Sequence, residues 1–349
     1  MKVAVVSQKF SPGHIAHLRA YKELFSATTE KVELFLTPEY EKFMEVVDGI
    51  VYTDDIQRVV DSHPDLVFIY NISISNISLA KKCNKARIKT VYVLHEPRCS
   101  MKELMAEGKN IFKMIGANII NGLICRIVDK VLLASETGRK NYNKYMRASN
   151  RNYDVFPLIF LDEYDLDNQY SRDYFSYIGG FTDVHACGEF LRFMEYGLSK
   201  TEDMKFLIAT RMNVSRYLKN DVFKNSIANG RLLVQDGRPM TTEEINGFYR
   251  QSICVWNAYN RSTQSGVLPN ALMQGAPVIV NENGAAKEIM DDRTVGCFID
   301  MPPDNKQIMD CYRYVEEHLE EMEQNARKLF LNKYYYKSCF DLAKEVILS

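Results

Sequence analysis

The first half of the chain alternates short apolar runs with segments whose apolar residues recur at helical spacing. In the segment 14–25, for example, Ile15, Leu18 and Leu24 fall on one face of a helix. Continuous apolar strands separated by helices are typical of a parallel sheet that is covered on both faces. The strands predicted in this half are 3–7, 31–36, 64–71, 89–97 and 129–135.

The same alternation restarts in the second half, after a polar and acidic stretch at about 160–172. The strands predicted there are 173–180, 204–211, 230–237, 252–259 and 276–284. The sequence therefore predicts an α/β protein with domains at 1–162 and 163–334, and a C-terminal helix at 335–349 that packs back on the first domain. Ligands of such open sheets bind at the carboxyl ends of the strands.

Length and charge add to this division. At 349 residues the chain exceeds the roughly 250 to 300 residues at which single hydrophobic cores stop growing. The net charge is only −1, but residues 81–151 hold 16 Lys and Arg against 5 Asp and Glu. Such a region attracts phosphates or anionic lipid head groups, and a solvated basic face without a ligand is the alternative.

The eight cysteines occur singly, without a CxxC pair or a His-rich neighbour. The sequence therefore supports neither a zinc site nor a disulfide framework, and reduced thiols favour the cytoplasm. The start MKVAVVSQKF reads as a buried strand rather than a signal peptide. No stretch approaches the roughly 18 to 20 apolar residues that span a bilayer, so we expect a cytoplasmic protein that at most touches the inner face of the cell membrane.

Five segments follow one another in an order that resembles a known family. They are VVSQKFSPG, VLHEP, VDKVLLASE, YIGG and SGVLPNALMQGAPVIVNENGAAKE. Together they resemble the glycosyltransferases of the GT-B fold, in which two Rossmann-like, doubly wound domains face a central cleft, and in particular the retaining enzymes of family 4. The resemblance covers nearly the whole chain and is most specific from Ile253 to Glu288. It implies a nucleotide-sugar donor on the second domain, a saccharide acceptor on the first, and a reaction without metal ion or cofactor.

The donor loop departs from the family pattern. The family has two glutamates here, separated by seven residues, that contact the donor sugar and the ribose. In this chain Ser262 and Asn270 occupy these positions. Asn270 keeps an acceptor oxygen, so the resemblance implies a weaker ribose contact. Gln264 and Asn260 are candidate replacements for the first acid.

The main chain of the same loop needs no acid. Its amides at the start of a helix are suited to hold the sugar and the phosphates, because NH groups and the helix dipole both favour an anion. The resemblance assigns this role to Ser265, Gly266, Val267 and Leu268. A plain helix start with Pro269 in its first turn is the alternative.

The cations that the family places against the diphosphate are also absent from their usual positions. An Arg and a Lys normally follow the first strand of the second domain, where this chain has Gly179, Gly180 and then FTDVHACGEF. Arg211 and Arg238, at neighbouring strand ends, are candidate replacements. Surface arginines without a ligand are the alternative for both.

Three further residues match family positions. His95 ends the strand KTVYVLH and matches the histidine close to the donor sugar, so we assign it as the catalytic candidate; a histidine held structurally by Glu96 or by a backbone carbonyl is the alternative. Gly13 matches the first-turn glycine that lets the backbone approach the ligands, and a turn glycine is the alternative. Glu288 matches the acid after the family's Gly-Gly turn.

Two histidines of the first helix, His14 and His17, lie one turn apart, but without a third ligand they predict no metal site. The segment 111–130 is apolar with basic flanks. It fits an interfacial helix that meets a lipid-linked acceptor at a membrane, and it fits a core helix equally well.

The resemblance predicts transfer of a sugar from a nucleotide-sugar to a lipid-linked saccharide in the synthesis of a surface polysaccharide, either LPS O-antigen or capsule. Nucleic acid is not an expected partner. The altered motifs leave a second hypothesis, a pseudo-glycosyltransferase that acts as a binding or assembly partner without turnover. A nucleotide-sugar epimerase is a third.

Overall fold

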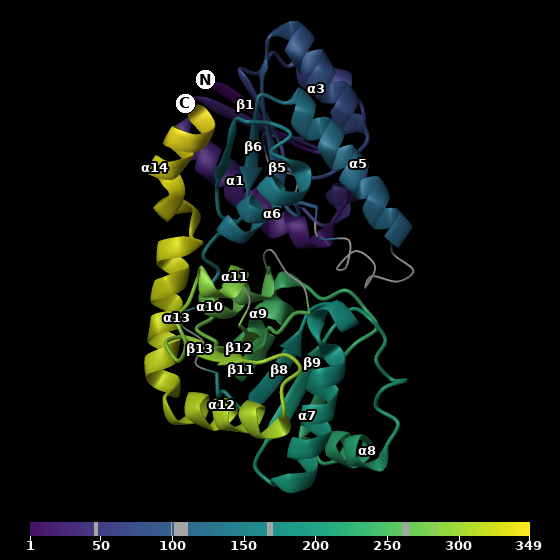
Figure 1. Ribbon diagram of the computed structural model, residues 1–349, viewed down its shortest axis with the longest axis vertical. Helices are drawn as coiled ribbons and strands as arrows, with labels where there is room; N and C mark the ends of the chain where they lie inside the picture. The colour runs from purple at the N-terminus through teal and green to yellow at the C-terminus, as the bar shows by residue number, and fades with distance from the viewer. Residues whose placement is uncertain (45–47, 99, 101–110, 166–169, 261–264, 283) are drawn as a thin grey trace. The chain divides into compact units, whose positions relative to one another are not determined.

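The computed structural model describes residues 1–44, 48–98, 100, 111–165, 170–260, 265–282 and 284–349. The chain forms two compact units (Figure 1). One unit contains Met1–Leu161 together with Lys333–Ser349, and the other contains Asp162–Asn332. We call them the N-terminal unit and the central unit.

The N-terminal unit is built on seven parallel strands in the order β3-β2-β1-β4-β5-β6-β7. The strands are β1 (Lys2–Ser7), β2 (Lys31–Leu36), β3 (Ile50–Tyr52), β4 (Leu66–Ile69), β5 (Lys89–Leu94), β6 (Lys130–Leu133) and β7 (Tyr153–Val155). The helical segments are η1 (Pro12–His14), α1 (Ile15–Thr28), η2 (Pro38–Lys42), α2 (Ile56–Asp61), α3 (Ser75–Ala86), α5 (Ile111–Ile127), α6 (Glu136–Met146), η5 (Tyr336–Cys339), α14 (Phe340–Ala343) and η6 (Lys344–Leu348).

Both faces of this sheet are covered, as its continuous apolar strands require. On one face, α1 and the C-terminal turns pack against the sheet, with Leu24 and Ile347 in one buried cluster. On the other face, α2, α3 and α5 contribute Val59, Leu79 and Ile124 to a second cluster. The last residues of the chain therefore complete the core of its first unit.

The central unit has six parallel strands in the order β10-β9-β8-β11-β12-β13. The strands are β8 (Tyr174–Ile178), β9 (Lys205–Ala209), β10 (Leu232–Gln235), β11 (Ser252–Trp256), β12 (Val278–Asn281) and β13 (Gly296–Ile299). The helical segments are η4 (Asp183–His185), α7 (Cys187–Lys200), α8 (Asp221–Ala228), α9 (Thr242–Arg250), α10 (Val267–Met273), α11 (Gly284–Lys287), α12 (Asn305–Glu317) and α13 (Leu319–Lys333). Its core is aromatic: Phe175, Phe190 and Trp256 share one buried cluster.

Two parallel α/β sheets confirm the predicted fold class. The pattern missed β3, β7 and β13, which are three or four residues long and lie at sheet edges. Strands β3 and β7 are only partly buried, so they lack the continuous apolar run that marks a central strand. Strand β13 is mostly buried but only four residues long. No helix within the described ranges is both long and apolar enough to cross a bilayer.

Strand order also locates the ligand-binding edge of each sheet. In both sheets the chain first adds strands to one side of its first strand and then crosses to the other side. The crossover lies between β1 and β4 in the N-terminal unit and between β8 and β11 in the central unit. At such a switch point the loops after the two strands diverge and leave room for a ligand at their carboxyl ends.

Candidate functional site

In the central unit, the loops after β8 and β11 come together at the switch point. Gly179 directly follows β8 and has φ +128°, a conformation that residues with a side chain rarely adopt. A Cβ built on Gly179 would lie 3.4 Å from Cγ2 of Val267, the first residue of α10. Gly179, a predicted donor-site residue, therefore lies against the start of α10, the helix predicted to hold the donor.

Ser265 holds this turn in place through its side chain. Its Oγ donates to Oδ1 of Asn257 at 2.8 Å and accepts from the amides of Val267 at 3.1 Å and Leu268 at 3.3 Å. A serine hydroxyl has one proton, so in the 2.8 Å contact with Tyr259 the phenol is the donor. Two of the four amides predicted to hold a ligand are thus engaged by the chain itself.

Tyr259 links this turn to the next strand. Its amide donates to Oδ1 of Asn281 at 2.8 Å, and Nδ2 of Asn281 donates back to the carbonyl of Tyr259 at 2.9 Å. Asn281 ends β12, the neighbour of β11. Burial raises the pKa of Tyr259 to about 12, so at neutral pH the phenol stays protonated and keeps its role as donor.

The second predicted glycine is also held closely. The carbonyl of Gly180 accepts from Nδ1 of His185 at 2.6 Å and from the Tyr177 hydroxyl at 2.8 Å. A Cβ on Gly180 would lie 3.1 Å from Cε1 of His185. The His185 ring meets the Tyr259 ring edge to face at 4.7 Å, which joins the loop after β8 to the loop after β11.

The predicted ribose contact and its neighbours lie on or beside α10. Nδ2 of Asn270 donates to the Gly266 carbonyl at 2.8 Å, so this amide group is turned toward its own helix start. Gly266 is exposed, and a Cβ there would meet no atom within 4 Å. Glu288 follows α11 and is partly buried. Ser262 and Gln264 lie outside the described residues.

Asn260, the other candidate replacement for the first acid, serves a structural contact. Its Nδ2 donates to the Asp183 carbonyl at 2.6 Å and its amide donates to the Val184 carbonyl at 2.9 Å. These bonds tie the loop after β11 to η4. The side-chain amide of this candidate is therefore engaged in a contact between two loops of the site.

The two candidate cations differ in their surroundings. Arg238 forms a bidentate pair with Glu244, at 2.5 and 3.1 Å, and this guanidinium lowers the pKa of Glu244 to about 2. Glu244 also closes the capping box of α9 with Thr241. Arg211 is exposed beyond the end of β9, the strand next to β8, and makes no ion pair with any described residue.

In the N-terminal unit, His95 lies in a cluster of aromatic rings at the carboxyl ends of β4 and β5. Its Nε2 donates to the Tyr70 carbonyl at 2.7 Å, which is the backbone partner that the sequence left open. The His95 ring stacks on His14 at 5.0 Å between centroids and meets the Tyr70 ring edge to face at 4.6 Å. His17 contacts the same Tyr70 ring and bonds through Nδ1 to the Ile159 carbonyl at 3.0 Å.

Burial keeps these three histidines uncharged. It lowers the pKa of His14 to about 3, with smaller contributions from His95, His17 and Lys9. It lowers the pKa of His17 and of His95 to about 4, in spite of their bonds to backbone carbonyls. At neutral pH the Nε2–H of His95 is therefore fixed on Tyr70, and Nδ1 is the acceptor atom of the ring.

A second network, which sequence reasoning missed, shapes the loop between β1 and η1. The Tyr40 hydroxyl contacts Oγ of Ser7 at 2.9 Å and donates to the Lys9 carbonyl at 3.1 Å. Nδ2 of Asn71 donates to the same Ser7 Oγ at 2.8 Å and to the same carbonyl at 2.5 Å. Gly13 follows this loop, exposed, with no atom within 4 Å of a built Cβ.

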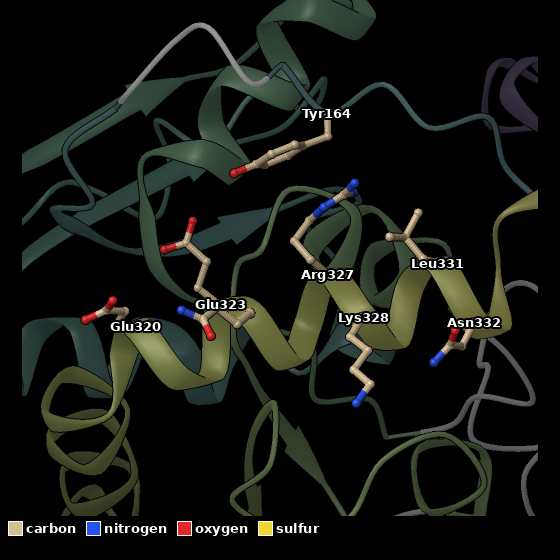
Figure 2. Close-up of a pocket in the computed structure, with 8 residues that line it drawn as sticks. Tyr164, Glu320, Glu323, Arg327, Lys328, Leu331 and Asn332 are labelled. Atoms are coloured by element: carbon tan, nitrogen blue, oxygen red, sulfur yellow. The ribbon is translucent and has the colours of Figure 1, made fainter.

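A cavity of the central unit lies apart from these residues. It has a volume of about 550 Å³ and lies along α13, as Figure 2 shows. It is lined by Tyr164, Glu320, Glu323, Gln324, Arg327, Lys328, Leu331 and Asn332. Arg327 pairs with both carboxylate oxygens of Asp162 at 3.0 and 2.8 Å and lies 4.2 Å over the Tyr164 ring. These contacts fasten the start of the central unit to its last helix, which is a structural role.

No set of three His, Cys, Asp or Glu side chains in the described ranges is placed to hold a metal ion. The cysteines within those ranges are free thiols, and six of the seven are buried.

A search of the sequence against protein-family models and against curated proteins finds no match. Solved structures do match, and they show that the chain has the GT-B glycosyltransferase fold. HepE of Anabaena, solved in complex with UDP, is 12% identical with a TM-score of 0.72, and 100% of each chain is covered. The same protein in complex with UDP-glucose is 14% identical with a TM-score of 0.68, over 100% of this chain and 99% of that one.

Two further structures have the same fold. Sucrose-phosphate synthase of Thermosynechococcus elongatus is 10% identical with a TM-score of 0.72, covering 99% of this chain and 98% of that one. A glycosyltransferase of Rickettsia africae is 12% identical with a TM-score of 0.68 over the same shares of the two chains. At these identities the likeness concerns the fold alone.

Proposed function

We propose that the protein is a glycosyltransferase that takes a sugar from a UDP-sugar and transfers it to a saccharide acceptor. The observation that carries the proposal is the assembly at the β8/β11 switch point. There Gly179 lies against Val267, and Ser265 fixes the start of α10 through Asn257 and Tyr259. The choice of UDP rests on HepE, which binds UDP and UDP-glucose with the same fold.

The central unit supplies the donor site in this proposal. The diphosphate lies against the loop of Gly179 and Gly180, which the close contacts with Val267 and His185 hold beside the start of α10. The amides of Ser265 and Gly266 face it from the start of α10, and Asn270 offers its Oδ1 to the ribose. Glu288 contacts the donor from the turn after β12. Arg211 supplies positive charge from the end of β9, because Arg238 is held by Glu244.

The N-terminal unit supplies the acceptor side. His95 is uncharged and rigidly placed, so it acts as a neutral hydrogen-bonding group near the transferred sugar rather than as a cation. Gly13 has no neighbour that requires a glycine, which leaves room there for a ligand. Stabilisation of the departing diphosphate by fixed donors accounts for the catalysis, so no side-chain nucleophile is needed. Retention of the configuration of the sugar is what the resemblance to the family 4 enzymes implies.

The acceptor in this proposal is a lipid-linked saccharide of a surface polysaccharide, assembled at the cytoplasmic face of the membrane. Its support is the basic segment 81–151, which favours an anionic partner or surface. The predicted product is either LPS O-antigen or capsule.

Calorimetric titration with UDP, GDP, ADP, dTDP and CMP tests the donor site. UDP is expected to bind most tightly, and UDP-glucose is expected to be hydrolysed slowly when no acceptor is present. Ser215→Ala, on an exposed loop of the same unit, is the control and should bind UDP unchanged. If none of the five nucleotides binds, the proposal fails.

A second candidate is a pseudo-glycosyltransferase that binds a partner without turnover. It is favoured by Asn270 in place of an acid and by the engagement of Arg238 with Glu244. Complementation of a deletion strain separates the two candidates. The double variant Asn270→Ala and Arg211→Ala should abolish complementation by an enzyme, whereas a scaffold should tolerate it.

A further inference from the structure

Helix α5 (Ile111–Ile127) exposes a stripe of large apolar side chains. The exposed fractions are 81% for Phe112, 37% for Ile115, 59% for Ile119 and 41% for Leu123. The spacing i, i+3, i+7 and i+11 places all four on one face of the helix. We call them the α5 stripe.

The stripe is not an unused core face, because α5 is anchored by buried residues near its C-terminal end, away from the stripe. Ile124 and Cys125 are buried in the cluster that also holds Leu79 of α3. The Tyr92 hydroxyl donates to Oδ1 of the buried Asn121 at 2.6 Å. The helix is therefore anchored firmly in the N-terminal unit, with the stripe turned outward.

Elsewhere in the described ranges, exposed large apolar side chains occur one to an element. Single residues of this kind are normal on a protein surface, whereas a contiguous row marks an interaction site. One of the single residues, Ile74, is 72% exposed directly before α3, the helix that packs against α5 (Figure 1). An exposed apolar residue thus also precedes the neighbouring helix.

The charges of this helix pair have one sign. Over their described lengths, α3 and α5 contain no Asp or Glu. Their exposed basic residues are Lys81, Lys85, Lys113 and Arg126. An apolar row on a helix pair whose charges are all basic matches the interface of an anionic bilayer, where the head groups take the charge and the acyl boundary takes the apolar side chains.

We propose that the α5 stripe docks the protein onto an anionic lipid surface, with Phe112, Ile115, Ile119 and Leu123 inserted at the head-group boundary and the basic residues of α3 and α5 on the lipid phosphates. The surface serves the acceptor side of the proposed function, but binding to lipid requires neither nucleotide nor transfer. Its test can therefore fail while UDP binding succeeds, and the reverse.

Flotation of the full chain with vesicles tests the docking. Binding is expected to vesicles of phosphatidylcholine and phosphatidylglycerol in equal parts, and to be weak with phosphatidylcholine alone. The double variant Phe112→Ser and Ile119→Ser should lower binding about tenfold or more, because it removes the two most exposed side chains of the stripe. The matched control Ile227→Ser and Leu233→Ser removes exposed apolar residues of the central unit and should bind as the wild type does.

Charge and insertion are measured separately. Replacing Lys81, Lys85 and Arg126 by Gln should lower binding about fivefold for each residue that faces the membrane. The variant Phe112→Trp should show a blue-shifted emission on addition of the anionic vesicles. Thermal melting checks that each variant is folded.

Three results would overturn the proposal. One is a wild-type protein that does not float with anionic vesicles, and another is equal binding by the stripe variant and the control. The third is a dimer in solution that the stripe variant dissociates, since that would assign the stripe to a second copy of the chain.

Discussion

The two sheets have the same strand topology, but the side-chain clusters at their carboxyl edges are held by different kinds of contact. In the N-terminal unit, the His14 and His95 rings stack on each other and both meet the Tyr70 ring edge to face. In the central unit, Ser265, Asn257 and Tyr259 form a chain of hydrogen bonds between small polar groups. The histidine cluster is therefore held mainly by ring packing and the Ser265 cluster by directed bonds, although the first edge also carries the hydrogen-bonded network of Ser7, Tyr40 and Asn71.

What the two edges share is the absence of formal charge from these clusters. Burial keeps the three histidines of the first edge neutral, and the second is made of hydroxyl and amide groups. An anionic leaving group would therefore be stabilised by main-chain amides and oriented dipoles, which cost no desolvation of a charged side chain. Arg211 is the candidate that would add a full charge.

The largest expected effect is a fall in stability of the N-terminal unit in mild acid. The unfolded chain takes up protons on its histidines below pH 6.5, whereas the folded unit resists until about pH 3 to 4. The contribution of these histidines to the free energy of unfolding is therefore fully present above pH 6.5 and is lost as the pH falls. The loss is about 2 kcal/mol per histidine between about pH 7 and 5. Hydrogen exchange of the β1, β4 and β5 amides measures it.

The variant His95→Gln keeps a donor for the Tyr70 carbonyl. Unfolding of this variant in mild acid should take up one proton fewer than unfolding of the wild type, so its stability should depend less on pH. His63→Asn is its control, because His63 is exposed and Asn tolerates its φ of 50°. The central unit is followed in the same experiment by the fluorescence of Trp256, the single tryptophan, which lies in that core. If the stability of the two units depended equally on pH, the contrast between the buried histidine cluster and the hydrogen-bonded Ser265 cluster would be wrong.

The second effect concerns the hydrogen-bonded edge. Ser265→Ala removes the partner of two amides, of Asn257 and of the Tyr259 hydroxyl, and should destabilise the central unit by about 2 to 3 kcal/mol. Urea unfolding followed by Trp256 fluorescence measures this loss. Ser265→Thr keeps the hydroxyl and should recover most of the stability and the UDP binding. An Ala variant as stable as the wild type would show that this edge is held by packing as well.

The fold could be predicted from the sequence because the central strands are continuous apolar runs. The meeting of Gly179 with Val267 follows from the same reasoning, since both come after strands that flank one switch point. The contacts of Ser265 with Asn257 and Tyr259, and of Tyr259 with Asn281, depend on side-chain directions at the ends of β11 and β12. No periodicity in the sequence encodes these.

The histidine cluster shows the same limit. His14 and His17 were visible as a pair one turn apart, and His95 as a strand-end residue. That they share one site with Tyr70 depends on how α1 lies across β4 and β5. For Arg238, however, the sequence did indicate a structural partner. Thr241 and Glu244 match a capping box directly after it, and the Glu244 carboxylate that caps α9 also pairs with the arginine.

The smallest expected effect separates the two arginines of the hydrogen-bonded edge. Arg211→Ala should weaken UDP binding about fivefold, because an exposed charge near a phosphate contributes roughly 1 kcal/mol or less, and the loss should shrink at high salt. Arg238→Ala should leave the affinity for UDP unchanged, since its guanidinium is already paired with Glu244. Calorimetric titration at low and high salt measures both variants. Equal losses for the two would mean that Arg238 leaves Glu244 when the nucleotide binds, and the charge of the donor site would then come from both strand ends.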